Sequence, residues 1–479
     1  MIFHTNLNLY PTRPTVRFIN SVWSILVIFL VSCGSLKEAT DDGYSENAPD
    51  MLFYAATGEE CCGEDPHPVH GVESSDGGFI LCGKSIDSEG GLDGFLLKIG
   101  PSLPSGTVFL EEEGEQSYSW AQTFGSSGTW EVANSVTTTQ DAVFVAGMET
   151  TSNGIGHRSL RKYDLVSGGL LWATTFASST QGMDSAFESI QSTADGGVII
   201  AGYSNAEPGS AEGFKSFGNP IGGTANIMYF TAELLENSDA PSGPSWEQSY
   251  RGIGSIRSIR PVLEGGYVFT ASQTEELYVA IRINDQGEET WRTPLSDHGE
   301  ATDLAVLSVD GISTGVAVVG HKSENEGIDG SVTSMDMDGT IQWSQLYGNP
   351  IGGINEFFGL DAGNPKLIYD ECWGIQSNNQ GGAVIACGTG IEGCDEYGIG
   401  TAIRSECNSD PRTTWRSLLI EFDSTGSEIW HRTDSYYFDS EEEAAATASE
   451  HVIRTEAGNY ASVMDQDFGI GLLVLDLVP

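Results

Sequence analysis

The first residues whose types and spacing could carry chemistry form a short cluster of cysteines and histidines. Cys61, Cys62, His67 and His70 fall within ten residues of one another. Thiolates and imidazoles bind zinc and copper, so Cys61, His67 and His70 could hold a metal ion and, with Cys62, serve a metal-dependent oxidoreductase. Adjacent cysteines lack the two-residue gap of the usual zinc clamp. We therefore favour the alternative, a disulfide beside surface histidines.

Three further segments match known sequence motifs but lack the structural context that those motifs require. Residues 78–85 fit the phosphate-loop pattern, residues 388–393 fit a dinucleotide fingerprint, and residues 311–315 mimic a nucleophile elbow around Ser313. Such phosphate sites need a helix N-terminus, and the elbow needs a strand–turn–helix unit. The three segments instead lie in an apolar strand, before a cysteine-closed loop and in a hairpin turn. Nucleotide binding and serine catalysis are not assigned to them.

The remaining cysteines predict disulfides, because an exported protein forms them readily. Two pairs are predicted because their members share one long loop or lie on neighbouring strands, and a third because Cys82 takes the place of Cys387 in another repeat. The predicted pairs are Cys394 with Cys407, Cys372 with Cys387, and Cys82 with Cys61 or Cys62. One cysteine of the adjacent pair is left over.

An apolar segment near the N-terminus predicts export. Residues 21–33 form an apolar run too short to span a bilayer comfortably, and we interpret residues 1–32 as a signal peptide. Leu30-Val-Ser-Cys33 resembles the lipobox of bacterial lipoproteins, which implies lipidation at Cys33. We expect residues 33–50 to be a flexible tether. The expected location is the outer membrane or surface of a bacterium, with secretion as the alternative.

The charge balance is strongly acidic. The 479 residues include 68 Asp and Glu against 21 Lys and Arg, which gives a formal net charge of −47. Such a charge repels nucleic acid and anionic headgroups, so membrane contact is expected only through the lipid anchor. Most of the acids are expected to be solvated. Some could converge on calcium or on a basic partner.

A glycine-led apolar strand recurs seven times and organises the whole chain. A turn glycine followed by β-branched and aromatic residues predicts a strand that begins at a tight turn. Regular recurrence predicts an array of sheet units. The seven copies are residues 76–83, 141–147, 194–202, 264–270, 315–320, 381–388 and 458–463.

Each copy continues with a second apolar strand, a turn that begins with Asp or Asn and ends with Gly, and a strand that carries Trp. Residues 284–291, 336–343 and 423–430 are the clearest turns, each with Trp four residues after Gly. With the strand before each glycine pair, the unit has four strands, as a propeller blade does. We predict that the tryptophans pack between blades. They are Trp120, Trp172, Trp246, Trp291, Trp343 and Trp430.

This repeat resembles that of secreted bacterial β-propeller proteins, many of them lipoproteins of unknown role. The resemblance covers residues 51–479 and implies an all-β, seven-bladed propeller of four-stranded antiparallel blades. It does not imply a function. The seventh unit lacks a Trp strand after residues 469–479, so we predict that residues 51–57 complete that blade and close the ring.

Loops between second and third strands, and between successive blades, should share one end of the propeller, the loop face. The binding candidates there are Asp87, Glu89, Asp93, His321, Glu324, Glu326, Asp329, Glu392, Asp395 and Glu396. We favour a non-catalytic, monomeric body that binds a protein or glycan partner at this face. The alternatives are a glycan hydrolase or lyase with two carboxylates, the oxidoreductase above, and a structural envelope or adhesion component. Convergence of two carboxylates or of histidines in a pocket at the channel mouth would favour an enzyme.

Overall fold

The computed structural model describes one part of the chain, and all of it belongs to the unit Ser35–Pro479. None of the described residues belongs to a helix that is long and apolar enough to span a bilayer. The described residues are 36–38, 45, 47–57, 61–101, 106–112, 115–116, 118–209, 220–274, 277–324, 327–347, 369–390, 415–434, 436–438, 447–466 and 469–476. The predicted signal peptide lies outside them, as do Cys33, Cys394, Cys407, Glu326, Glu392, Asp395 and Glu396.

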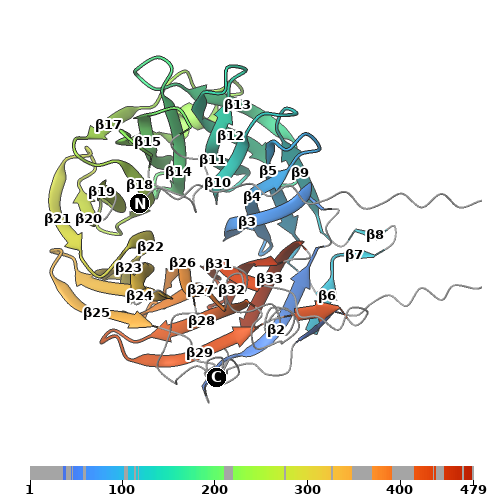
Figure 1. The fold of residues 1–479 in the computed structure, drawn as a ribbon, viewed down its shortest axis with the longest axis vertical. Helices are drawn as coiled ribbons and strands as arrows, with labels where there is room; N and C mark the ends of the chain where they lie inside the picture. Colours follow the sequence, from blue (N-terminus) through green and yellow to red (C-terminus); the bar gives the residue numbers. More distant parts are fainter. Residues whose placement is uncertain are drawn as a thin grey trace, which may run out of the picture. The chain divides into compact units, whose positions relative to one another are not determined.

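Seven four-stranded antiparallel blades surround one axis, so the predicted all-β propeller is confirmed (Figure 1). Blades one to four, each from the innermost strand outward, are β3 (Glu64–Glu73), β4 (Phe79–Ile86), β5 (Leu92–Ile99) and β9 (Trp120–Phe124); β10 (Glu131–Thr138), β11 (Ala142–Thr150), β12 (Gly156–Asp164) and β13 (Leu170–Phe176); β14 (Asp184–Ser192), β15 (Val198–Ala206), β16 (Thr224–Phe230) and β17 (Trp246–Tyr250); and β18 (Ser255–Pro261), β19 (Tyr267–Thr274), β20 (Leu277–Ile283) and β21 (Glu289–Leu295).

The last three blades follow the same order. They are β22 (Glu300–Val309), β23 (Ile312–Glu324), β24 (Gly327–Asp336) and β25 (Ile341–Tyr347); β26 (Tyr369–Ser377), β27 (Ala383–Gly390), β28 (Arg416–Phe422) and β29 (Glu428–Asp434); and β31 (Thr447–Arg454), β32 (Tyr460–Gln466), β33 (Gly469–Asp476) and β2 (Asp50–Ala56). The other described elements are β1 (Leu36–Glu38), β6 (Gly106–Phe109), β7 (Glu111–Glu112), β8 (Glu115–Gln116), α1 (Ala232–Glu236) and β30 (Tyr436–Phe438).

The repeated Asp, Gly and Trp residues join one blade to the next. In blade five, Asp336 Oδ1 accepts two backbone N–H groups within the turn between the third and fourth strands, at 3.0 and 2.9 Å. Gly339 of that turn has φ 82°, and a Cβ on it would lie 2.8 Å from the ring of Trp291 in blade four. The indole of Trp291 donates to the carbonyl of Met337 at 2.9 Å. The turn glycine therefore supplies both a positive φ and room for the tryptophan of the preceding blade.

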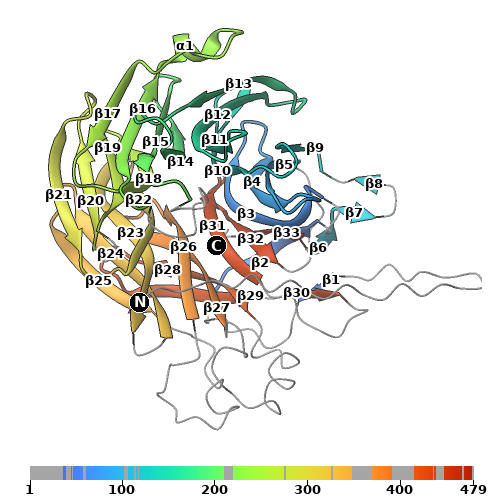
Figure 2. The same ribbon diagram turned by 45° about the horizontal axis from the view of Figure 1, so that its top comes forward.

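The N-terminal strand closes the ring as predicted. Strand β2 pairs antiparallel with β33, from Met51 opposite Leu475 to Ala56 opposite Gly471. The fully buried Tyr54 donates its hydroxyl to the side chain of Gln466. Strand β6, which comes from the connection inside blade one, pairs parallel with the other edge of β2 (Figure 2). The sequence did not predict this pairing of β6 with β2.

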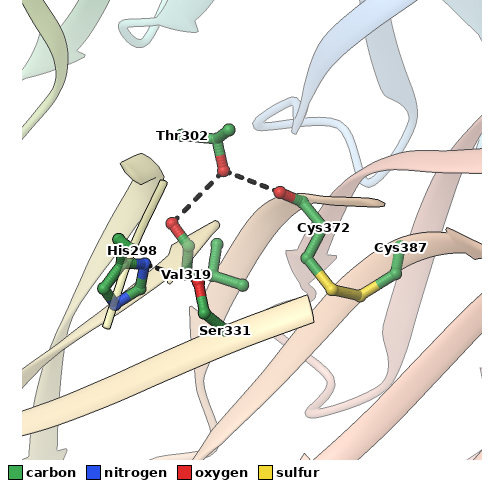
Figure 3. The surroundings of a disulfide bond; sticks show 6 residues. All are labelled: His298, Thr302, Val319, Ser331, Cys372 and Cys387. Atoms are coloured by element: carbon green, nitrogen blue, oxygen red, sulfur yellow. Dashed lines mark hydrogen bonds between the residues drawn. A yellow bond between two sulfur atoms is a disulfide. The ribbon is translucent and has the colours of Figure 1, made fainter. Parts of the chain in front are cut away.

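One predicted disulfide is present and another is wrong. Cys372 and Cys387 are bonded across β26 and β27, and Thr302 of blade five donates to the carbonyl of Cys372 at 2.8 Å (Figure 3). Cys61 and Cys62 are bonded to each other, and not to Cys82.

The strand register explains this correction. Glu64, two residues after Cys62, lies opposite Ile86 at the C-terminal end of β4, whereas Cys82 lies opposite His70. Cys82 corresponds to Ala386, not Cys387, because each lies opposite the residue that follows the bulge, His70 for Cys82 and Gly374 for Ala386.

Parts of the expected tether contact the propeller. Strand β1 pairs antiparallel with β30. The backbone N–H of Ser45 donates to the carbonyl of His431 at 3.0 Å, and Arg432 donates to the carbonyl of Pro49 at 2.8 Å. These contacts differ from the expectation of a wholly flexible tether, because backbone groups and a buried arginine of blade six bind the segment.

Candidate functional site

The innermost strand of every blade carries a β-bulge at the same point, and the residue after each bulge holds a corresponding place around the axis. These residues are His70, Ser135, Ser189, Ser258, Asp303, Gly374 and His451. Several accept a backbone N–H from the next blade; Ser189, for example, accepts from Ile259 at 3.2 Å, and Asp303 from Ile375 at 3.3 Å. Bulges commonly redirect side chains in this way. They build a polar ring around the axis.

Gly374 interrupts this ring and lets side chains of other blades meet. A Cβ on Gly374 would lie 2.7 Å from the Cα of His451. Past it, Asp303 Oδ2 of blade five lies 3.8 Å from His451 Nδ1 of blade seven. His451 stacks on His70 of blade one with ring centroids 4.1 Å apart, and Arg260 of blade four donates to Asp303 at 2.8 Å. The side-chain network of Arg260, Asp303, His451 and His70 thus joins four blades.

A cavity of about 520 Å³ lies against this side-chain network. It is at the end of the ring that holds the turns between first and second strands, which we call the turn face. Arg260, His70 and His451 line it, together with the first-to-second-strand turns of blades one, two, three and seven. Glu73 also lines it and accepts the backbone N–H of Glu456 at 2.6 Å. Burial and the neighbouring Glu456 carboxylate raise the pKa of Glu73.

A second charged network joins blades three, four and five. Arg257 is 1% exposed and lies 2.8 Å from Glu300 and 3.9 Å from Glu188. Burial would raise the pKa of Glu300, but Arg257 and His321 together lower it. Burial would lower the pKa of His321, but its pairing with Glu300 at 3.6 Å raises it. His321, predicted as a loop-face ligand, therefore belongs to a buried ion network and contacts the Trp373 ring edge-on.

The predicted acids of blade one serve local structure. The carboxylate of Asp87 accepts backbone N–H groups of Gly128, Gly91 and Glu89, which lower its pKa. Burial and the charge of Asp87 raise the pKa of Asp93. These acids are caps or partly buried groups and do not line the loop-face groove below.

The other described candidates lie apart. Asp329 pairs with Lys322 in the register of β24 and β23, and Glu324 ends β23 opposite Gly327. The predicted acids thus fall into two groups, one on blade one and one on blade five, which are not neighbouring blades.

The predicted metal set is also not assembled. Among the described residues, no group of three or more His, Cys, Asp or Glu could hold a metal ion. Cys61 is in a disulfide and has no thiolate to offer. His67 lies 3.1 Å from Asp465 and 4.0 Å from Glu450, whereas His70 stacks on His451. The described residues therefore do not bring Cys61, His67 and His70 together as one ligand set.

The loop face holds a groove of about 410 Å³ over blades one to three. Trp130, 37% exposed, forms one side, and Thr129, Thr150 and Ser152 add hydroxyl groups. Asp184, the one acid among the described residues that line it, accepts backbone N–H groups on both carboxylate oxygens, at 2.9 and 2.7 Å.

A second hollow of about 320 Å³ lies on the other side of the same loop. Thr151 lines both hollows, and Asn153, His157 and Gln181 line the second. The sequence did not predict this groove. The available signal was Trp130 itself, which stands outside the six tryptophans of the repeat.

Comparisons with known proteins support the repeat class. Residues 234–356 match a family profile described as PQQ_2, outer membrane protein assembly factor BamB. This segment contains all eight strands of blades four and five. Together with the seven-bladed ring, the match fits a bacterial propeller-repeat protein. A comparison with curated proteins gives no match.

Solved structures show propeller folds at low identity. Sqt1 from Chaetomium thermophilum is 10% identical with a TM-score of 0.44, covering 90% of this chain and 98% of that one. A protein of unknown function from Bacteroides caccae is 11% identical with a TM-score of 0.37, covering 76% and 95%. Quinohemoprotein alcohol dehydrogenase ADHIIG from Pseudomonas putida HK5 is 10% identical with a TM-score of 0.38, covering 88% and 77%. These likenesses carry no inference about function.

Proposed function

We propose that the protein is a non-catalytic binding propeller that takes a glycan in the loop-face groove beside Trp130. The observation that supports this is an exposed indole in a groove of hydroxyl groups. Trp130 offers a large flat apolar surface, on which the C–H faces of a sugar ring can pack. Thr129, Thr150 and Ser152 can exchange hydrogen bonds with the sugar hydroxyls. Long loops on a rigid scaffold are a common place for such a site.

The lining groups favour binding over hydrolysis. A glycoside hydrolase needs two carboxyl groups beside the scissile bond. Asp184 is the one acid among the described residues that line this groove, and backbone N–H groups already occupy both of its oxygens. Attachment of the propeller to a bacterial surface through Cys33 is part of the same proposal, motivated by the lipobox-like Leu30-Val-Ser-Cys33.

The test is a glycan array on the purified chain, followed by calorimetry on the strongest hit. Trp130→Ala should weaken that binding at least tenfold, because a lost aromatic contact is worth more than about 1.4 kcal/mol. Ile341→Ala is the matched control, since Ile341 is also partly exposed but lies on the outer strand of blade five. Parallel runs with EDTA test whether calcium contributes.

Two outcomes would reject the proposal. One is an array without hits, while a protein partner is captured in a Trp130-dependent way. The other is equal affinity of Trp130→Ala and Ile341→Ala for the glycan.

A further inference from the structure

We propose that the turn-face cavity is a second binding site, independent of the loop-face groove, and that it takes a small neutral ligand rich in hydroxyl groups, such as a mono- or disaccharide. Its volume of about 520 Å³ is within the range of roughly 300–1,000 Å³ that small-ligand pockets have. Residues from six of the seven blades line it, so it lies on the axis of the ring.

The floor of the cavity is rigid and carries no excess charge. The guanidinium of Arg260 donates to both oxygens of Asp303, at 2.8 and 3.1 Å, and to Ser258 at 3.0 Å. Asp303 is fully buried, so this pair cancels its own charge inside the protein. Beside it, the rings of His70 and His451 stack on each other and are buried.

The walls carry polar groups that can bind a ligand. Gln191 lines the cavity, and its carboxamide makes no hydrogen bond with another described residue. Arg454 also lines it and carries a guanidinium, which is a hydrogen-bond donor only. A ligand hydroxyl group can accept from the guanidinium of Arg454 and can exchange hydrogen bonds with the amide of Gln191.

The charges of the cavity favour a neutral ligand over an anion. Arg260 lines it but is already neutralised by Asp303. The other charged lining residues are Arg454 on one side of the balance and Glu73 and Glu456 on the other, so an anion gains no net attraction there. The whole chain has a formal net charge of −47, which repels anions before they reach the mouth. A neutral sugar meets no such penalty.

The test uses the purified full chain and a panel of neutral mono- and disaccharides, with uronic acids and inorganic phosphate as charged probes. Binding is measured by saturation-transfer NMR and then by calorimetry. We expect at least one neutral sugar to bind. Gln191→Ala should weaken that binding about tenfold, as expected for loss of paired hydrogen bonds to a buried ligand. Arg454→Met should weaken it similarly.

The controls separate this site from the groove. Gln248→Ala removes the same side chain from the exposed outer strand β17 and should bind as the unchanged protein does. Trp130→Ala should also leave this binding unchanged, so the two proposals can fail separately. Three results would overturn the inference: no neutral sugar binds, only the charged probes bind, or Gln191→Ala and Arg454→Met bind as tightly as Gln248→Ala.

Discussion

At the scale of single residues, several of the few cations of the chain are buried and paired with acids. Arg257, Arg260 and Arg432 are buried or nearly so, and each contacts a buried carboxylate. A buried charge is tolerated when it is paired and hydrogen-bonded. In a chain with 68 acids and 21 Lys and Arg, these pairs also join blades, because Arg257 of blade four contacts acids of blades three and five.

Replacing Arg257 should therefore destabilise the propeller strongly. Arg257→Met leaves Glu188 and Glu300 without their cation, and removal of one partner of a buried ion pair costs about 3–5 kcal/mol. Urea unfolding at pH 7 measures the difference. Arg292→Met is the matched control: Arg292 pairs with Glu289 on the surface, and this variant should lose no more than about 1 kcal/mol.

The loss should also depend on pH. The pKa of Glu300 is lowered from 4.5 in the folded protein, against the effect of burial, by Arg257 and His321. Such a carboxyl adds stability that is complete above its unfolded pKa and is lost as the pH falls through its folded pKa. The gap between the protein and Arg257→Met should thus be widest near neutral pH and should narrow below 4.5. A gap that stays constant down to pH 3 would contradict this account.

At the scale of elements, the outer strands of blades one, three, four and five are locked to the next blade by a tryptophan that packs on a turn glycine. Trp291 with Gly339 and Trp343 with Gly426 show the same arrangement, and both indoles donate to a carbonyl of the facing turn. The sequence predicted the tryptophans as inter-blade residues and the glycines as turn residues. It did not show that the two features act on each other.

This pairing predicts different effects at two glycines with almost the same backbone. Gly339 and Gly90 have φ of 82° and 83°, but a Cβ on Gly339 would meet the ring of Trp291 at 2.8 Å, whereas Gly90 has no atom within 4 Å. Gly90→Ala should cost about 1–2 kcal/mol for its backbone conformation. Gly339→Ala adds overpacking and should cost about 2–5 kcal/mol. Equal losses in urea unfolding would show that the tryptophan contact is unimportant.

At the scale of the whole molecule, stability depends on a single strand from the other end of the chain. Tyr54→Ala removes a fully buried ring from β2 and should cost about 3–5 kcal/mol. Amides of residues 52–56 should then exchange with solvent much faster than in the unchanged protein. Leu52 lies on the same strand but is 36% exposed. Leu52→Ala should therefore change the free energy of unfolding and the amide exchange rates only slightly. Fast exchange of these amides in the unchanged protein would contradict closure by β2.

The sequence predicted the ring well and the site poorly, for physical reasons. Blades are local repeats, so their turns, tryptophans and closing strand leave a periodic signal. The side-chain network of Arg260, Asp303, His451 and His70 depends on contacts between residues that are far apart in sequence. No residue near Gly374 in the sequence indicates that this glycine leaves the space in which Asp303 approaches His451. The error at Cys82 arose because Cys82 follows its glycine pair by four residues and Cys387 by five, so the two cysteines do not hold the same position of the strand.

The closing strand also constrains the order in which the protein can be made. Residues 50–56 leave the ribosome before any blade exists, yet their antiparallel partner, residues 469–476, follows the strands of all six other blades. Until that partner is made, an apolar strand and the edge that it will cover remain unpaired, and exposed edges invite pairing with other chains. The arrangement that gives the finished ring its closure makes the nascent chain dependent on protection while six blades are synthesised.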